Sequence, residues 1–362
     1  MSHDWIQSPD DPRLDELCRQ LAAAADRLDD AQDWPGEQLA RCGRAGVFAW
    51  FVPVQWGGLG WSDVDVVRGY LRLSAACLTT TFILTQRTGA CQRIIGGASD
   101  AARQRWLAGL ISGDIFGTVG ISHLTTSRRH LAQPVLQARE VAGGFVLDGY
   151  SPWVTGADRA QVIVLGATLA DGRQILVAVP TNLPGVSTPP PARLVGVSAS
   201  RTGQVHCDGV SIGHEWLLAG PAENVMRTGV GAGTGGLQTS TLAAGLAGAA
   251  IDYLARESAR RPDLAGPAAS LRRECDEFVA DLVALAGGRS VCTNDSLRTR
   301  ANSLVLRATQ AALAAAKGAG YVFGHPVGRW CREALFFLVW SCPQPVLAAN
   351  LCELAGIESD DG

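Results

Sequence analysis

The chain has 362 residues, of which 18% are charged and 47% hydrophobic, and its formal net charge is -3. This composition excludes a disordered chain, a collagen and a coiled coil, and the length suits one to three packed domains. The near-neutral charge provides no basic surface for nucleic acid or for an anionic membrane. Lys317 is the only lysine and Gly318 follows it, which excludes a phosphate-binding loop of the GxxxxGK[ST] kind.

The ten cysteines form no CxxC pair, and none stands at zinc-ligand spacing from a histidine. We therefore interpret them as small buried hydrophobic residues and expect no metal site. The N-terminus is polar and lacks an apolar signal segment, and no run reaches about 20 apolar residues without a polar interruption. These features predict a cytoplasmic protein without a membrane span.

The first part of the chain, residues 1–115, has helical periodicity. Leucines recur there at steps of three, four and seven residues, at Leu14, Leu17, Leu21 and Leu28. This spacing predicts a helix with one buried face. Further along, Ser62 predicts the N-cap of a helix over residues 64–76, with Asp63 and Asp65 in its first turn.

The pattern changes to β at about residue 116 and back to helix at about residue 231. Gln161–Gly166 and Gln174–Pro180 are rich in β-branched residues and flank the turn residues Asp171 and Gly172, which predicts strands of an antiparallel sheet or barrel. The later helical patterns are long and rich in alanine, as in closely packed bundles. We expect three domains, at residues 1–115, 116–230 and 231–362.

Several short motifs occur in an informative order. They are Trp56–Gly60 (WGGLG), Phe116–Ser122 (FGTVGIS), Leu147–Gly156 (LDGYSPWVTG), the long helix from Gly245 that leads to Arg261, and Gly318–Tyr321 (GAGY) followed by Arg332 and Glu333. In their order and spacing these motifs resemble the acyl-CoA dehydrogenase superfamily over nearly the whole chain. One departure lies after Arg261, where Leu264 and Ala265 replace the usual aromatic residue.

The resemblance implies an α+β fold with an N-terminal helical domain, a central antiparallel β-barrel and a C-terminal four-helix bundle. It further implies FAD bound between barrel and bundle, and a homotetramer or homodimer whose subunits complete each other's cofactor sites. The implied reaction is oxidation of an acyl thioester at its α- and β-carbons, with hydride transfer to flavin N5. The electron acceptor or reductase stays open.

Six residues match the cofactor-binding positions of that family. Trp153 can supply a flat apolar wall for the flavin, and Thr155 and Ser122 can supply hydroxyl and amide groups. Arg261 can clamp a pyrophosphate, and Gly318 and Gly320 belong to the last glycine-rich turn. The alternative roles are a core tryptophan at Trp153 and a solvated helix-terminal arginine at Arg261.

The expected catalytic base is absent. The family usually places a glutamate nine residues after the arginine that matches Arg332, and that position holds Ser341, which is no base at neutral pH. The alternative position for the glutamate falls at Gly235 and Gly236. Neighbouring Cys342 can act as a base or nucleophile only with a lowered pKa, and the sequence indicates no positive neighbour, so a small packed residue is the favoured interpretation.

His123 is a further candidate, because it lies near the expected flavin edge and titrates near neutrality. It can be a base, a hydrogen-bond donor to an oxygen adduct of reduced flavin, or a structural residue. Three functions therefore stay open: an FAD-dependent dehydrogenase acting on an acyl thioester, a reduced-flavin-dependent monooxygenase, and a non-catalytic scaffold. The first is the leading hypothesis.

Overall fold

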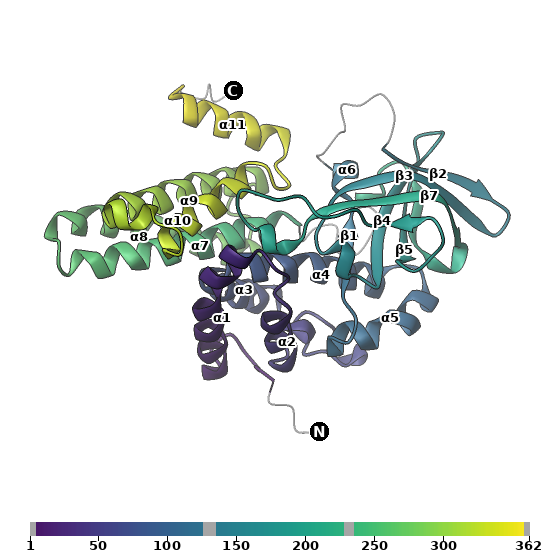
Figure 1. Cartoon of the computed structure of the whole chain (residues 1–362), viewed down its shortest axis with the longest axis horizontal. Helices are drawn as coiled ribbons and strands as arrows, with labels where there is room; N and C mark the ends of the chain where they lie inside the picture. Colours follow the sequence, from purple (N-terminus) through teal and green to yellow (C-terminus); the bar gives the residue numbers. More distant parts are fainter. Residues whose placement is uncertain (1–4, 126–134, 228–234, 358–362) are drawn as a thin grey trace.

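The structure is a computed structural model that describes residues 5–125, 135–227 and 235–357. The predicted boundary between residues 230 and 231 and the polar start, residues 1–4, lie outside the described residues. Helices come first along the chain, then strands, then helices again (Figure 1). The first five helices are α1 (Pro12–Ala31), α2 (Gly36–Arg44), α3 (Asp63–Ala76), α4 (Leu78–Gly96) and α5 (Asp100–Ser112).

The local sequence signals account for these helices. The four periodic leucines all lie on the buried face of α1, as their spacing predicts. Ser62 is the N-cap of α3, and its hydroxyl accepts a hydrogen bond from the Asp65 amide at 3.2 Å. Both sequence predictions for this part of the chain are confirmed.

The central strands form one sheet. They are β1 (Gly117–Gly120), β2 (Leu136–Val141), β3 (Gly144–Val154), β4 (Val162–Leu169), β5 (Gln174–Pro180), β6 (Val186–Ser187), β7 (Gly203–Gly213) and β8 (Leu217–Ala222). Their order is β6-β7-β3-β2-β4-β5-β8, and β1 pairs with β4 outside this path. β4 is buried on both faces: Ile163 and Leu165 face one apolar core, and Val162 and Val164 face a second core shared with α4 and α5.

The predicted α+β architecture is confirmed, but the term antiparallel β-barrel describes the central sheet only loosely, in two respects. The sheet is mixed, because both β1 and β2 run parallel to β4. Among the described strands the sheet is also open, because the end strands β6 and β8 pair with β7 and β5 and not with each other. β1 and β2 pair with successive parts of β4, at residues 162–165 and 168–169. A regular antiparallel barrel would instead have one antiparallel strand along this edge of β4.

The C-terminal helices pack against one another and against α3 (Figure 1). They are α7 (Gly235–Ser258), α8 (Ala265–Ala286), α9 (Asn294–Ala316) and α10 (Pro326–Leu335), and α11 (Gln344–Ala355) lies over α9. A Cβ atom at Gly245 of α7 would lie 2.5 Å from the Leu71 carbonyl oxygen of α3. This close approach requires glycine and joins the first and last helical parts of the chain.

The sequence predicts no membrane span. Within the described ranges, no helix combines the length and the apolar character that crossing a bilayer requires.

Candidate functional site

Trp153 lies at an irregularity near the end of β3. The register between β3 and β7 shifts between Ser151 and Val154, and Trp153 has a φ of 56° in the left-handed region. Its indole is 53% exposed, whereas most large apolar side chains of this domain are buried. Trp153 lines a hollow of about 200 Å³ together with Pro189, Pro190 and Gln204. The backbone thus holds a flat aromatic surface at an open hollow.

Ser122 and Thr155 flank this tryptophan in different ways. Ser122 begins the short helix α6 (Ser122–Thr125), and its hydroxyl donates to the Pro152 carbonyl at 3.1 Å, next to Trp153. Thr155 is 1% exposed, and its hydroxyl lies 3.1 Å from the Thr202 hydroxyl in the interior. The structure therefore brings Ser122 and Trp153 together, while the Thr155 hydroxyl already has a protein partner.

His123 is buried beside the same strands. Its Nε2 lies 2.7 Å from the Gly166 carbonyl, to which it can donate, and its Nδ1 has no partner among the described residues. Burial lowers the pKa of His123, and the hydrogen bond to Gly166 opposes this shift. A neutral imidazole that donates to β4 fits the structural role considered for this residue.

Arg261, Gly318 and Gly320 form a separate group at an end of the helical bundle. Arg261 lies between α7 and α8, and its Nη1 donates to the Ala315 carbonyl near the end of α9 at 2.7 Å. Gly318 and Gly320 follow directly in the 3-10 helix Lys317–Tyr321. A Cβ atom at Gly320 would lie 2.6 Å from the Ala316 Cβ, so packing alone explains this glycine. Figure 1 shows the bundle extending away from the sheet, so the six predicted cofactor residues fall into two groups.

The segment that contains Ser341 follows the 3-10 helix Phe336–Leu338. Ser341 is exposed with a φ of 47°, and Cys342 is half-buried. Phe82 of α4 contacts the segment edge-on, with ring centroids 4.8 Å from both Phe336 and Trp340. These aromatic contacts hold the segment against the N-terminal helices.

Arg298 of α9 is a positive neighbour of Cys342 that the sequence analysis missed. Its Nη2 donates to the carbonyls of Phe337 and Trp340 at 3.1 and 2.8 Å. Burial raises the pKa of Cys342 above its usual value, and the Arg298 charge opposes this effect. The thiol is therefore protonated at neutral pH, which argues against Cys342 as a base. The stretch Leu297–Val305 mixes polar and apolar residues and also contains Arg300, so nothing in the sequence singled out Arg298.

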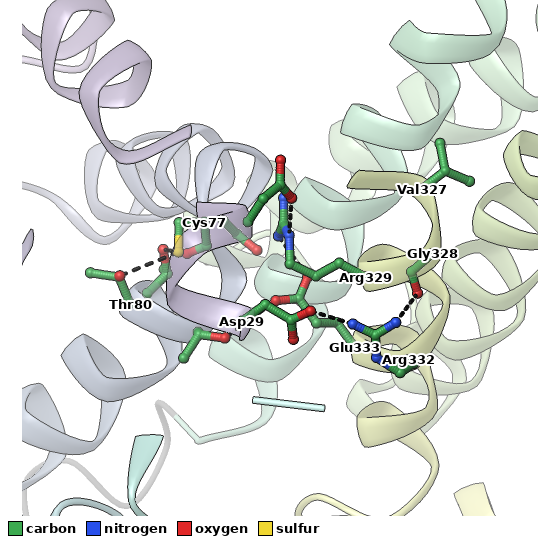
Figure 2. Close-up of polar contacts among 12 residues, drawn as sticks. Asp29, Cys77, Thr80, Val327, Gly328, Arg329, Arg332 and Glu333 are labelled. Atoms are coloured by element: carbon green, nitrogen blue, oxygen red, sulfur yellow. Dashed lines mark hydrogen bonds and ion pairs between the residues drawn. The ribbon is translucent and has the colours of Figure 1, made fainter. Parts of the chain in front are cut away.

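A buried ionic network ties α10 to α1 and α4 (Figure 2). Arg329 binds Asp26 at 2.9 Å and Glu333 at 3.1 Å, and Glu333 also accepts a hydrogen bond from Thr79 at 3.2 Å. Arg332 pairs with Asp29 on the same side of α10. This network fixes the helix that leads into the Ser341 segment.

Metal binding has no support in the described ranges. They contain no group of three or more His, Cys, Asp and Glu side chains that could hold a metal ion.

Residues 15–114 match the model of the acyl-CoA dehydrogenase N-terminal domain. The probable acyl-CoA dehydrogenase YngJ of Bacillus subtilis is 23% identical over 87% of this chain and 88% of its own. The short-chain specific acyl-CoA dehydrogenase from mitochondria of Rattus norvegicus is 24% identical over 92% of this chain and 87% of its own.

A solved structure shows the same fold. A glutaryl-coenzyme A dehydrogenase in complex with glutaryl-CoA superimposes with a TM-score of 0.80 at 19% identity, covering 95% of both chains. The order of a helical part, a sheet and a second helical part is therefore shared with that enzyme along nearly the full length of both chains.

Proposed function

Because the chain belongs to the acyl-CoA dehydrogenase superfamily, we propose that it is an FAD-dependent oxidoreductase that acts on an acyl thioester. The observation that carries the cofactor assignment is Trp153, whose indole is 53% exposed beside a hollow at the end of β3. The left-handed φ of Trp153, the exposure of its indole and the adjacent hollow together support a ligand at this place.

The residues present fit a flavin in part. Trp153 would cover one face of the ring, and Ser122 fixes the backbone before Trp153 through the Pro152 carbonyl. The Thr155 hydroxyl is engaged with Thr202, so Thr155 would contribute its backbone amide. When bound, FAD supplies the capacity to accept a hydride from the substrate. Arg261 and the glycines near it would serve a second subunit of a homodimer or homotetramer.

For proton abstraction, this chain lacks the glutamate that the family resemblance expects. Ser341 is exposed at the position where the family resemblance expects a glutamate, and Cys342 is a protonated thiol. Glu333 is a nearby carboxylate in sequence, but it is 1% exposed and bound to Arg329 and Thr79. For oxidation of a thioester, the α-proton would therefore have to leave to water or to a group of the substrate itself.

The absence of a carboxylate at Ser341 favours a second candidate function, a reduced-flavin-dependent monooxygenase. This reaction needs no base at the α-carbon. The Nε2 atom of His123 would not donate to an oxygen adduct of reduced flavin in this arrangement, because Nε2 is bound to the Gly166 carbonyl. Ser122 and Trp153 would then position the ring and restrict water access.

One experiment separates these functions. The purified full-length protein is loaded with FAD and mixed anaerobically with a panel of acyl-CoA and acyl-carrier-protein thioesters. Loss of oxidised-flavin absorbance identifies the dehydrogenase. Chemically reduced protein mixed with oxygen and the same panel identifies the monooxygenase if a hydroxylated product forms. FAD binding without reaction in either arm would contradict both and favour a non-catalytic scaffold.

A further inference from the structure

Arg298 and Asn302 form an unusual polar pair inside the C-terminal helices. They lie one turn apart on the same face of α9, and their exposed fractions are 3% and 0%. Nε and Nη1 of Arg298 have no hydrogen-bond partner among the described residues, and neither do the two polar atoms of the Asn302 amide. Four buried polar atoms on two neighbouring side chains are therefore left unpaired.

This arrangement is energetically costly unless something compensates it. Native interiors pair almost all of their polar groups, and a buried cation without a counter-charge is strongly unfavourable. Within the described parts of the chain, Arg298 forms no ion pair with a carboxylate, and its guanidinium carbon lies 5.8 Å from the centroid of the Phe337 ring, at the long end of a cation–π contact. Cys342 does not compensate the charge either, because burial raises its pKa and keeps the thiol neutral.

The surroundings enclose the pair on more than one side. The carbonyls of Phe337 and Trp340 accept hydrogen bonds from Nη2 of Arg298 and bring the Ser341 segment against α9. From α11, Asn350 is 3% exposed, and its amide lies 4.0 Å from the Cys342 sulfur. Figure 1 shows α11 lying along α9 as a separate layer. The pair thus belongs to a junction of three chain segments.

We propose that Arg298 and Asn302 bind a small oxyanion that carries one proton, of the bicarbonate or hydrogen phosphate kind. The free groups of Arg298 are donors, so the guest must be an acceptor and must supply negative charge. Asn302 offers a donor and also an acceptor, so one oxygen of the guest must bear a proton. A halide ion would leave the Asn302 oxygen unpaired.

The site is independent of the flavin and of the proposed reaction. Its occupant would hold Arg298, and Arg298 in turn holds the carbonyls of Phe337 and Trp340. Binding should therefore stabilise the folded chain and restrict the segment that contains Ser341.

Thermal unfolding of the full-length protein tests the proposal. Bicarbonate, phosphate and chloride are compared at constant pH and ionic strength. We expect at least one oxyanion to raise Tm by about 4 °C at a hundredfold excess over its Kd, and chloride to have no effect. The two oxyanion arms identify which of them the site prefers.

Two variants test whether the oxyanion raises Tm by binding at Asn302. Asn302→Leu removes the unpaired amide without touching the bonds to Phe337 and Trp340, and it should abolish the oxyanion effect. The matched control is Arg300→Gln on the same helix, since Arg300 is half-buried and paired with Asp281. This control should keep the full shift in Tm.

Two outcomes would overturn the proposal: an oxyanion shift that persists unchanged in Asn302→Leu, or equal shifts with chloride. If Asn302→Leu does not fold, a high-resolution crystal structure of the wild-type protein grown in bicarbonate or phosphate decides the question. Tetrahedral or trigonal density between Arg298 and Asn302 supports the site, and water alone or an adventitious ion only contradicts it.

Discussion

The Nη1 atom of Arg329 lies 3.1 Å from a carboxylate oxygen of Glu333, one turn along α10, and both side chains are buried (Figure 2). Arg329 also binds Asp26 of α1, and Glu333 also binds Thr79 of α4. One ion pair therefore joins the last bundle helix to two helices of the N-terminal part. Its position makes it a determinant of how the Ser341 segment sits against α4.

Removing one member of this pair should be far more harmful than removing both. Arg329→Met leaves the Glu333 carboxylate buried without its cation, and we expect the free energy of unfolding to fall by about 3–5 kcal/mol. The double variant Arg329→Met with Glu333→Leu should recover much of this loss, because no unpaired charge stays buried. Urea unfolding of the two single variants and the double variant measures the coupling. Additive effects would show that the pair does not act as a unit.

The same carboxyl group should make stability depend on pH. Burial raises the pKa of Glu333 above its usual 4.5, and Arg329 opposes the shift. Because the folded state then holds the proton more tightly than the unfolded chain, the contribution is complete below pH 4.5 and is lost as the pH rises through the folded pKa. Glu333→Gln should remove this decline. As the pH rises from 4.5, the urea midpoint of the wild-type protein should fall relative to that of Glu333→Gln. Parallel curves would contradict the prediction.

His123 should make the stability depend on pH with the opposite sign, so that stability falls on acidification. Burial lowers its pKa from 6.5, so the folded state binds the proton less tightly than the unfolded chain. Its contribution is present above pH 6.5 and is lost as the pH falls through the folded pKa. His123→Gln keeps a donor for the Gly166 carbonyl and should flatten the loss of stability on acidification. The control is His214→Gln, at an exposed histidine, which should behave like the wild-type protein.

The sequence predicted the helices well because their signals are local. The leucine spacing of α1 and the Ser62 cap of α3 each depend on residues within a few turns of one another. The sheet was predicted less accurately, because β-branched runs do not reveal that β1 and β2 both run parallel to β4. Strand direction and closure depend on pairings between distant segments, which composition does not encode.

The candidate site was likewise predicted only where its signals are local in the sequence. Trp153 was found from a short motif and Ser341 from its spacing after Arg332, but the exposure of the indole and the left-handed backbone at both residues required coordinates. Arg298 was missed because its partners, the carbonyls of Phe337 and Trp340, lie about 40 positions away in the chain. Backbone carbonyls leave no signature in a sequence, so no motif could have indicated this contact.

Trp153 should be required for cofactor retention. We expect Trp153→Ala to lower the amount of FAD bound per chain at least tenfold, because the ring loses its aromatic wall while a half-exposed side chain contributes little to the core. The flavin released from the purified protein is measured by absorbance and chromatography. Trp56→Ala is the matched control, since Trp56 is 39% exposed elsewhere on the surface. Equal flavin content in both variants would contradict the cofactor assignment.

Ser341 offers the most direct test of the missing base. If the Ser341 segment faces the bound substrate, Ser341→Glu should place a carboxylate where a proton can be removed, and anaerobic flavin reduction by acyl-CoA should become at least a hundredfold faster, within the usual range for general-base catalysis of about 10²–10⁴. Ser341→Gln is the matched control, because glutamine has the same shape without basicity. Both side chains stand at the same φ of 47°, so any backbone strain is common to the two variants. A rate gain in the glutamate variant alone would assign this position to proton abstraction, whereas equal rates in the two variants would place the chemistry elsewhere.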